Sequence, residues 1–218
     1  MPRITHPFGP LYSDHSRILI LGSFPSVRSR EQNFFYGHPQ NRFWKVIAAV
    51  FGEPLPETVN DKKDLILRND LALWDSIESC DIAGSSDASI RNVKANDISC
   101  ILDDCSIERI YCNGRKSHEL YCRHIEPQTG RQAECLPSTS PANAQWTLDR
   151  LIEAWSVLKD PGHRRGQPAV IYYCEMNSQH LGCITIAGIN LLNIFQLRVN
   201  KIYSGFTYKQ VLRFCQFN

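Results

Sequence analysis

Three short polar stretches of the chain hold the side chains best suited to chemistry. They are residues 22–26 (GSFPS), residues 36–44 (YGHPQNRFW) and residues 136–143 (LPSTSPAN). The second stretch contains His38 and Asn41. A neutral carboxamide such as that of Asn41 can orient a water molecule with its carbonyl oxygen, or it can donate hydrogen bonds to a leaving group. The other two stretches are rich in hydroxyl groups and backbone N–H groups, which suit phosphate oxygens.

Buried strands are expected directly before these stretches. The first stretch follows Arg17–Leu21, a β-branched and Leu-rich run, and a helix is expected from about Arg42 to Phe51. Strands alternate with helices along the chain, which predicts a parallel sheet flanked by helices. The polar stretches then meet at the carboxyl ends of its strands. The remaining expected strands are Leu71–Ile77, Glu108–Cys112 and Ala133–Leu136, and the remaining expected helices are Asn60–Asn69, Asn96–Asp104 and a segment from about Arg115 to Arg123.

Several segments are expected to be irregular. Residues 1–16 are interpreted as a lead-in, and Ser79–Ser89 is interpreted as a polar loop. Ser140 as N-cap and Pro141 at the first helical position predict that the last helix runs from there to about Leu158. Residues 159–168 (KDPGHRRGQP) are interpreted as a linker, and the β-like runs 169–174 and 183–187 follow it.

Composition excludes several classes of protein. Hydrophobic residues make up 43% of the 218 residues, which argues against wholesale disorder. The chain has no apolar run long enough to span a membrane, and its first residues lack the apolar core of a signal peptide, so we expect a protein that is not secreted. The nine cysteines include no CxxC pair and are expected to be free thiols, with no metal site.

Charge is distributed unevenly between two parts of the chain. Residues 1–158 hold 17 basic and 20 acidic residues, whereas residues 159–218 hold 7 basic and 2 acidic residues. Any polyanion must therefore bind the first part through a local basic patch. Arg28, Arg30, Arg42 and Lys45 provide such a patch near the first two stretches, although they could equally be ordinary solvated surface charges.

Taken together, the three polar stretches resemble the uracil-DNA glycosylase superfamily, and most closely its hypoxanthine-directed (deoxyinosine-directed, family six) branch. The resemblance covers about residues 14–158 and includes the order and spacing of the loops. It implies a three-layer αβα sandwich with a central parallel four-stranded sheet, formed by residues 1–158. Residues 159–218 would then be a linker and a C-terminal extension of unknown fold.

The resemblance also implies a monofunctional DNA glycosylase in base excision repair, which cuts the N-glycosidic bond of a flipped-out deaminated base, chiefly hypoxanthine. Such a reaction passes through an oxocarbenium-like sugar and needs no metal or redox cofactor. In mismatch-specific uracil/thymine glycosylases the first motif resembles GINPG, with an Asn that handles the water. Phe24 stands at that position here, which makes uracil activity doubtful. In the hypoxanthine-directed branch the essential Asn lies in the HPxNxFW segment, so the resemblance assigns catalysis to Asn41, with His38 as a second candidate. Asn41 directly precedes a helix and could instead be only its N-cap.

The other site residues follow from the same resemblance. The base pocket is expected to contain aromatic stacking groups and the ends of two strands, namely Gly22, Ser23, Phe24, Pro25, Phe35, Tyr36 and Asn113. DNA is expected to contact hydroxyl, amide and guanidinium groups of Ser26, Arg28, Arg30, Arg42, Ser138, Thr139, Ser140 and Asn143. Ordinary turn formation and helix capping are the alternative for the serine-rich stretches.

The expected partner is double- or single-stranded DNA that contains a damaged base, bound by a monomer in the nucleus or cytoplasm. Two alternative functions stay open at this point. One is a mismatch-specific uracil/thymine glycosylase, which Phe24 disfavours. The other is a non-catalytic nucleic-acid-binding module, which the basic residues 159–218 would fit.

Overall fold

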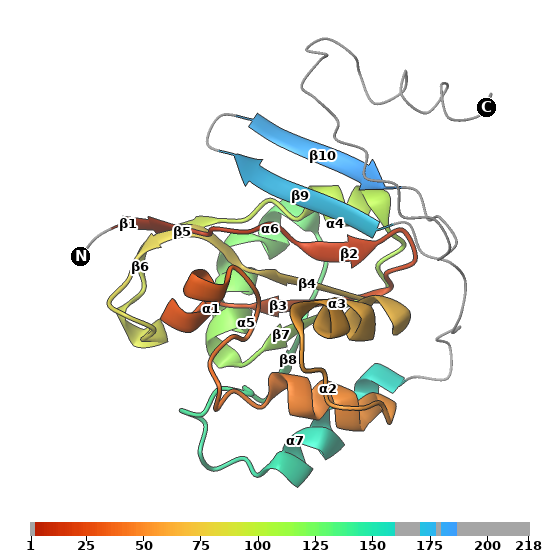
Figure 1. Cartoon of the computed structure of the whole chain (residues 1–218). Helices are drawn as coiled ribbons and strands as arrows, with labels where there is room; N and C mark the ends of the chain where they lie inside the picture. Colours follow the sequence, from red (N-terminus) through yellow and green to blue (C-terminus); the bar gives the residue numbers. More distant parts are fainter. Residues whose placement is uncertain (1–2, 160–170, 178–179, 187–218) are drawn as a thin grey trace, which may run out of the picture. The chain divides into compact units, whose positions relative to one another are not determined.

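A computed structural model describes residues 3–159, 171–177 and 180–186 (Figure 1). The chain divides into two units, residues 1–188 and 189–218, and the second lies outside the described residues. The elements in chain order are β1 (Arg3–Thr5), β2 (Leu11–Ser13), β3 (Ile18–Gly22), α1 (Val27–Gln32), α2 (Phe43–Phe51), α3 (Val59–Arg68), β4 (Leu71–Asp75), β5 (Ile77–Asp81), a 3-10 turn (Asp87–Ser89), β6 (Arg91–Ala95), α4 (Ser99–Asp104), β7 (Arg109–Asn113), α5 (Arg115–His124), α6 (Glu126–Thr129), β8 (Glu134–Leu136), α7 (Leu148–Trp155), a 3-10 turn (Ser156–Lys159), β9 (Ile171–Asn177) and β10 (His180–Ile186).

The expected parallel sheet forms the centre of the fold. Strands β4, β3, β7 and β8 lie side by side in that order, and every neighbouring pair is parallel. Every residue of β3 and β4 is buried, as expected of strands covered by helices on both faces. Helix α3 contacts β4 and β2, and helix α5 contacts β7 and β8. Because crossovers between parallel strands are right-handed, these two helices are expected on opposite faces of the sheet.

The sheet is wider than expected because antiparallel strands extend it at one edge. Strand β2 pairs with β4, β9 pairs with β2, and β10 pairs with β9, so the sheet has the order β10-β9-β2-β4-β3-β7-β8. Both β-like runs beyond residue 168 thus join this sheet (Figure 1). The division of the chain into domains 1–158 and 159–218 stays a prediction.

Two segments that were interpreted as irregular contain strands, and β1 and β5 from these segments belong to a second small sheet. Residues 1–16 contain β1 and β2, and part of Ser79–Ser89 belongs to β5, which pairs with β1 on one side and β6 on the other. The lead-in interpretation was wrong over β1 and β2, and the loop interpretation was wrong over residues 79–81, whereas residues 82–86 lie outside any strand or helix. These strands are three to five residues long, so their periodicity is too short to show in the sequence, and the pairing partner decides their conformation.

The start of the last helix is also corrected by the structure. Helix α7 begins at Leu148, and Thr147 is its N-cap, with a side chain that accepts a hydrogen bond from the N–H of Arg150. Residues 140–146 form turns instead of the expected first helical turns. The guanidinium of Arg42 donates to the carbonyl oxygens of Ser140, Asn143 and Trp146. A helix that began at Ser140 would need those carbonyls for its own hydrogen bonds.

Within the described residues, no helix has the length and apolar character that a membrane span requires. The same residues contain no group of three or more His, Cys, Asp or Glu side chains arranged to hold a metal ion.

Candidate active site

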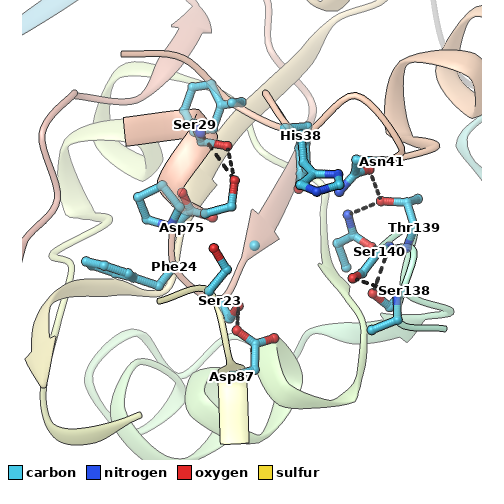
Figure 2. Close-up of a pocket in the computed structure, with 18 of the residues that line it drawn as sticks. Ser23, Phe24, Ser29, His38, Asn41, Asp75, Asp87, Ser138, Thr139 and Ser140 are labelled. Atoms are coloured by element: carbon cyan, nitrogen blue, oxygen red, sulfur yellow. Dashed lines mark hydrogen bonds between the residues drawn. The ribbon is translucent and has the colours of Figure 1, made fainter. Parts of the chain in front are cut away.

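A cavity of about 290 Å³ opens at the carboxyl ends of the parallel strands (Figure 2). Gly22 ends β3, Asp75 ends β4 and Asn113 ends β7, and the loop that follows β8 closes the cavity from another side. Thirteen of the residues predicted for the site line this cavity, namely Gly22, Ser23, Phe24, Pro25, Ser26, Phe35, Tyr36, His38, Asn41, Asn113, Ser138, Thr139 and Ser140. The structure therefore brings the three polar stretches of the sequence together around one cavity.

The carboxamide of Asn41 is held in one orientation by two donors. Its Oδ1 atom accepts the N–H of Phe43 at 2.9 Å and the hydroxyl of Thr139 at 3.0 Å. A backbone N–H can only donate, so Oδ1 and not Nδ2 must face Phe43. Among the described residues the Nδ2 group has no hydrogen-bond partner, and it is the polar group that Asn41 can offer to a ligand. Arg42 occupies the N-cap position of helix α2, so Asn41 is not the N-cap of the alternative interpretation, although it accepts the N–H of the first helical residue. Asn41 also lines the cavity.

Thr139 links the carboxamides of Asn41 and Asn113. The Nδ2 group of Asn113 donates to Oγ1 of Thr139 at 2.9 Å, and the N–H of Thr139 donates to Oδ1 of Asn113 at 3.0 Å. The Thr139 hydroxyl also donates to Oδ1 of Asn41, so it accepts from the Asn113 amide and donates to the Asn41 amide. Thr139 has no exposed surface, so its side chain has a position in the interior of the loop and not on its outer face.

His38 precedes Asn41 in a turn that presents both side chains to the cavity. The N–H of Asn41 donates to the carbonyl of His38 at 2.8 Å, with Pro39 at the second position, which proline favours. The Nδ1 atom of His38 accepts the N–H of Gln40 at 3.2 Å. In the neutral ring the proton is therefore on Nε2, which is a donor.

A buried carboxylate, Asp75, lines the cavity and was missed by sequence reasoning. Asp75 is 5% exposed, and its Oδ2 atom lies 2.8 Å from Nε2 of His6, which is 1% exposed. The N–H of Phe8 points to Nδ1 of His6 at 3.4 Å, which places the imidazole proton on Nε2, so that His6 donates to Asp75. A polar residue at the carboxyl end of a buried strand was the available signal for Asp75. His6 gave none, because 69 residues separate it from its partner.

Gly22 allows the carboxylate of Asp75 to lie against strand β3. A Cβ atom on Gly22 would lie 2.1 Å from Oδ1 of Asp75, far inside contact distance. Residue 22 must lack a side chain for Asp75 to hold this position. The glycine of the GSFPS stretch is thus explained by close packing between the ends of β3 and β4, and not by an unusual backbone angle.

Aromatic rings form much of the cavity wall. Phe24 is 8% exposed and Phe35 is 3% exposed, and the ring of Tyr36 stacks on Phe43 with centroids 3.8 Å apart. The hydroxyl of Tyr36 is buried without a hydrogen-bond partner within the described part of the chain. Burial and the nearby charge of Asp75 raise the pKa of Tyr36, so its hydroxyl keeps its proton and is a donor.

Four residues predicted to contact DNA do not line the cavity. Arg28 pairs with Glu31 at 3.0 Å on the surface, and Arg30 donates to the carbonyl of Pro25 at 2.7 Å. Arg42 holds the loop after β8, as described above, and Nδ2 of Asn143 donates within that loop to the carbonyl of Ser138 at 2.9 Å. The structure thus gives Arg42 and Asn143 contacts that shape the site.

A second carboxylate, Asp87, also lines the cavity and was not singled out in the sequence. Its Oδ1 atom accepts the hydroxyl of Ser23 at 2.9 Å (Figure 2). Asp87 lies in the loop between β5 and β6, within the segment that was interpreted as a polar loop only. No spacing signal in the sequence connects it to Ser23, because 64 residues separate the two.

Comparisons with known proteins show which proteins the chain is similar to. The family model described as the uracil DNA glycosylase superfamily matches residues 10–159. The chain is 33% identical over 158 residues to a protein of Methanosarcina acetivorans named hypoxanthine DNA glycosylase, a match that covers 72% of this chain and 99% of the relative. A protein of the same name from Methanosarcina barkeri is 32% identical over 139 residues, which are 62% of this chain and 86% of that relative.

A solved structure shares the fold as well. The solution NMR structure of a proposed uracil DNA glycosylase from Methanosarcina acetivorans superposes with a TM-score of 0.62 at 30% identity, over 72% of this chain and 97% of the other. Because the family model covers more than half of the chain, and the first relative is matched over nearly its whole length, this protein belongs to the uracil DNA glycosylase superfamily.

Proposed function

We propose that this protein is a monofunctional DNA glycosylase that hydrolyses the N-glycosidic bond of hypoxanthine in DNA. The observation that carries the proposal is the pairing of a donor with an acceptor in one cavity. Asn41 offers Nδ2, and Asp75 offers Oδ1. Relatives named for hypoxanthine match along most of this chain, which supports the same substrate.

The size of the cavity suits one base that has left the DNA stack. Its volume of about 290 Å³ lies at the lower end of the range of roughly 300–1,000 Å³ that is usual for ligand pockets. Flipping a base costs a few kcal/mol, which stacking and edge contacts must offset. The walls formed by Phe24, Phe35 and Tyr36 supply apolar area for this purpose.

The two carboxyl oxygens of Asp75 have separate tasks. His6 donates to Oδ2, which leaves Oδ1 as an acceptor beside the cavity. Hypoxanthine carries a hydrogen on N1, whereas N1 of adenine carries a lone pair. An ionised carboxylate only accepts hydrogen bonds, so it attracts the first base and repels the second. Asp75 thereby selects the deaminated purine against adenine.

Asn41 acts on the departing base. Because its carbonyl oxygen already accepts two hydrogen bonds, the amide is preorganised to donate through Nδ2 to an acceptor atom of the base. Negative charge develops on the base as the bond to C1′ breaks, and a fixed donor stabilises that charge. His38, with its proton on Nε2, is a second donor at the same edge, directed to the base or to a phosphate.

Contacts to the DNA strand are assigned to the rims of the cavity. Ser26, Ser138 and Ser140 present hydroxyl or N–H groups there, and Arg28 and Arg30 supply positive charge beside them. The protein acts as a monomer on double- or single-stranded DNA, inside the cell in the nucleus or cytoplasm.

Strand nicking tests this proposal. A duplex with one deoxyinosine is incubated with the full chain, abasic sites are cleaved with alkali, and fragments are quantified. Asn41→Ala and Asn41→Asp should both lower the rate by about 10²- to 10³-fold, because both remove the Nδ2 donors. Asn60→Ala, which removes an exposed amide on α3, is the matched control and should keep the wild-type rate.

Two results would contradict the proposal. Absence of nicking by the wild-type chain on deoxyinosine, with nicking on deoxyuridine, would assign the protein to uracil. Full activity of Asn41→Asp would show that the carbonyl oxygen, and not the amide nitrogen, performs the chemistry.

A further inference from the structure

A second, wider cavity adjoins the base cavity. It measures about 700 Å³, and it shares Asp87, Ser138, Ser140 and Ala142 with the base cavity. A flipped nucleotide keeps its phosphates on the DNA strand while its base enters the protein, so its deoxyribose must cross the boundary between a base pocket and a strand groove. The four shared residues mark that boundary, and Asp87 is the ionisable one among them.

Asp87 is held at this boundary by the loops on either side. Its Oδ1 atom accepts the hydroxyl of Ser23, as Figure 2 shows, while its Oδ2 atom has no partner among the described residues. The loop is fixed at both ends, because Oγ of Ser89 accepts the N–H of Ala83 at 2.9 Å and Oγ of Ser85 accepts the N–H of Val27 at 2.9 Å. Oδ2 is therefore a positioned acceptor.

The charges that face Asp87 come from two other elements. Burial of the carboxyl group raises the pKa of Asp87 most, and the charge of Asp75 on β4 raises it further, whereas the hydroxyl of Ser23 and the ammonium group of Lys116 on α5 lower it. Asp87 as a whole residue is exposed at the rim of the cavity. A raised pKa makes a carboxylate a stronger base than a free aspartate.

The other side-chain acceptors named above already have a partner or an assigned contact, because Oδ1 of Asp75 is assigned to the N1–H of the base. The carbonyl oxygen of Asn41 accepts two hydrogen bonds, and Oδ2 of Asp75 is bonded to His6 in the buried part of the cavity. Hydrolysis also needs an acceptor for the attacking water and negative charge beside the oxocarbenium-like sugar. Oδ2 of Asp87 is the carboxylate oxygen at the boundary where the sugar lies.

We propose that Asp87 is a catalytic carboxylate that positions and deprotonates the attacking water. The inference rests on the proposed glycosylase function. The bond from C1′ to the base breaks, and its electron pair leaves with the base, to which Asn41 donates. The water oxygen forms the new bond to C1′, and its proton passes to Oδ2 of Asp87 and then to solvent. The released base takes up a proton from solvent, which balances the reaction.

Asp87→Asn is the sharpest variant, because it keeps an oxygen acceptor for Ser23 and removes the base. Under single-turnover conditions with saturating enzyme, its rate on deoxyinosine DNA should fall by about 10²-fold or more. The affinity of Asp87→Asn for a duplex with 2′-fluoro deoxyinosine, whose N-glycosidic bond resists cleavage, should be unchanged or higher because the variant has one negative charge fewer. Asp103→Asn, an exposed carboxylate on α4, is the control and should match the wild type.

The pH profile and chemical rescue separate catalysis from structural support. The wild-type rate should rise with pH as Asp87 ionises and then level off. The rate of Asp87→Asn should lack this rise at acidic pH. Added formate should restore part of the rate of Asp87→Ala, whose melting temperature verifies folding.

The inference is overturned if Asp87→Asn keeps a rate within about twofold of the wild type, or if its only defect is weaker DNA binding. A wild-type chain that cleaves no damaged base would instead overturn the proposed function, so the two failures are distinguishable.

Discussion

Thr139 donates its hydroxyl to Oδ1 of Asn41 over 3.0 Å, although 98 residues separate them in the chain. This contact joins the loop before α2 to the loop after β8. It also decides what Asn41 can do, because it occupies the carbonyl oxygen and leaves the amide hydrogens for a ligand. The catalytic proposal thus depends on a buried residue that was predicted to contact DNA.

Substitution of Thr139 tests this dependence. Thr139→Val keeps the shape of the side chain but removes the hydroxyl, so the Asn41 amide is free to rotate and both Asn partners lose a contact. Misplaced groups of this kind cost up to about 10²-fold in rate, and an unsatisfied buried partner costs about 1–3 kcal/mol of stability. Single-turnover nicking and thermal unfolding measure the two effects.

Thr139→Ser is the matched control for that variant. It retains the hydroxyl and should keep a rate within a few-fold of the wild type. Equal rates for the Val and Ser variants would show that the contact between Thr139 and Asn41 has no part in catalysis.

Base selection should change when Asp75 becomes an amide. In Asp75→Asn, His6 still donates to the oxygen, so the new Nδ2 group faces the base. The Nδ2 group and the N1–H of hypoxanthine are both donors, so neither finds an acceptor in the other. Sites built to hydrogen-bond one substrate group disfavour, by several powers of ten, a substrate that leaves their polar groups unpaired. We expect activity on deoxyinosine to fall by about 10²-fold or more.

A panel of bases measures this effect. DNA with 1-methylhypoxanthine, which lacks the N1 hydrogen, should be a poor substrate for the wild type, and the variant should lose less on it than on hypoxanthine. If wild type and Asp75→Asn show the same ratio of rates for the two bases, Asp75 does not contact N1.

Arg42 is expected to act by shaping the loop after β8. Its guanidinium donates to the carbonyl oxygens of Ser140, Asn143 and Trp146. The ammonium group of a lysine lacks the planar set of N–H donors that these three contacts use. Arg42→Lys should therefore increase hydrogen exchange in residues 138–146 and lower the nicking rate by about 10-fold or more.

Arg68→Lys, in which an exposed arginine pairs with Glu53, is the control for charge-conserving substitution. A variant Arg42→Lys that binds DNA more weakly, with unchanged exchange in the loop, would instead support the predicted DNA contact of Arg42.

The sequence by itself determined the sheet and the loops that carry the site. Long buried strands such as Ile18–Gly22 and Leu71–Asp75 are visible as apolar runs, because each is covered on both faces. Polar residues directly after those runs had to meet at one edge of a parallel sheet. That is why the loops that carry Asn41, His38 and the serines could be predicted to lie together, whereas the catalytic role of Asn41 came from the resemblance to a known family.

Only the tertiary structure decided which polar groups are free to act. His6, Asp75 and Asp87 obtain their roles from partners 64 to 69 residues away, and local periodicity carries no information on such pairs. Residues 140–146 form turns although Ser140 and Pro141 are good local signals for the start of a helix. The reason is that Arg42 binds the carbonyl oxygens that the helix would have used. Hydrogen-bond partners are chosen by the folded chain as a whole, and with them the free donor of Asn41 and the free acceptors of both carboxylates.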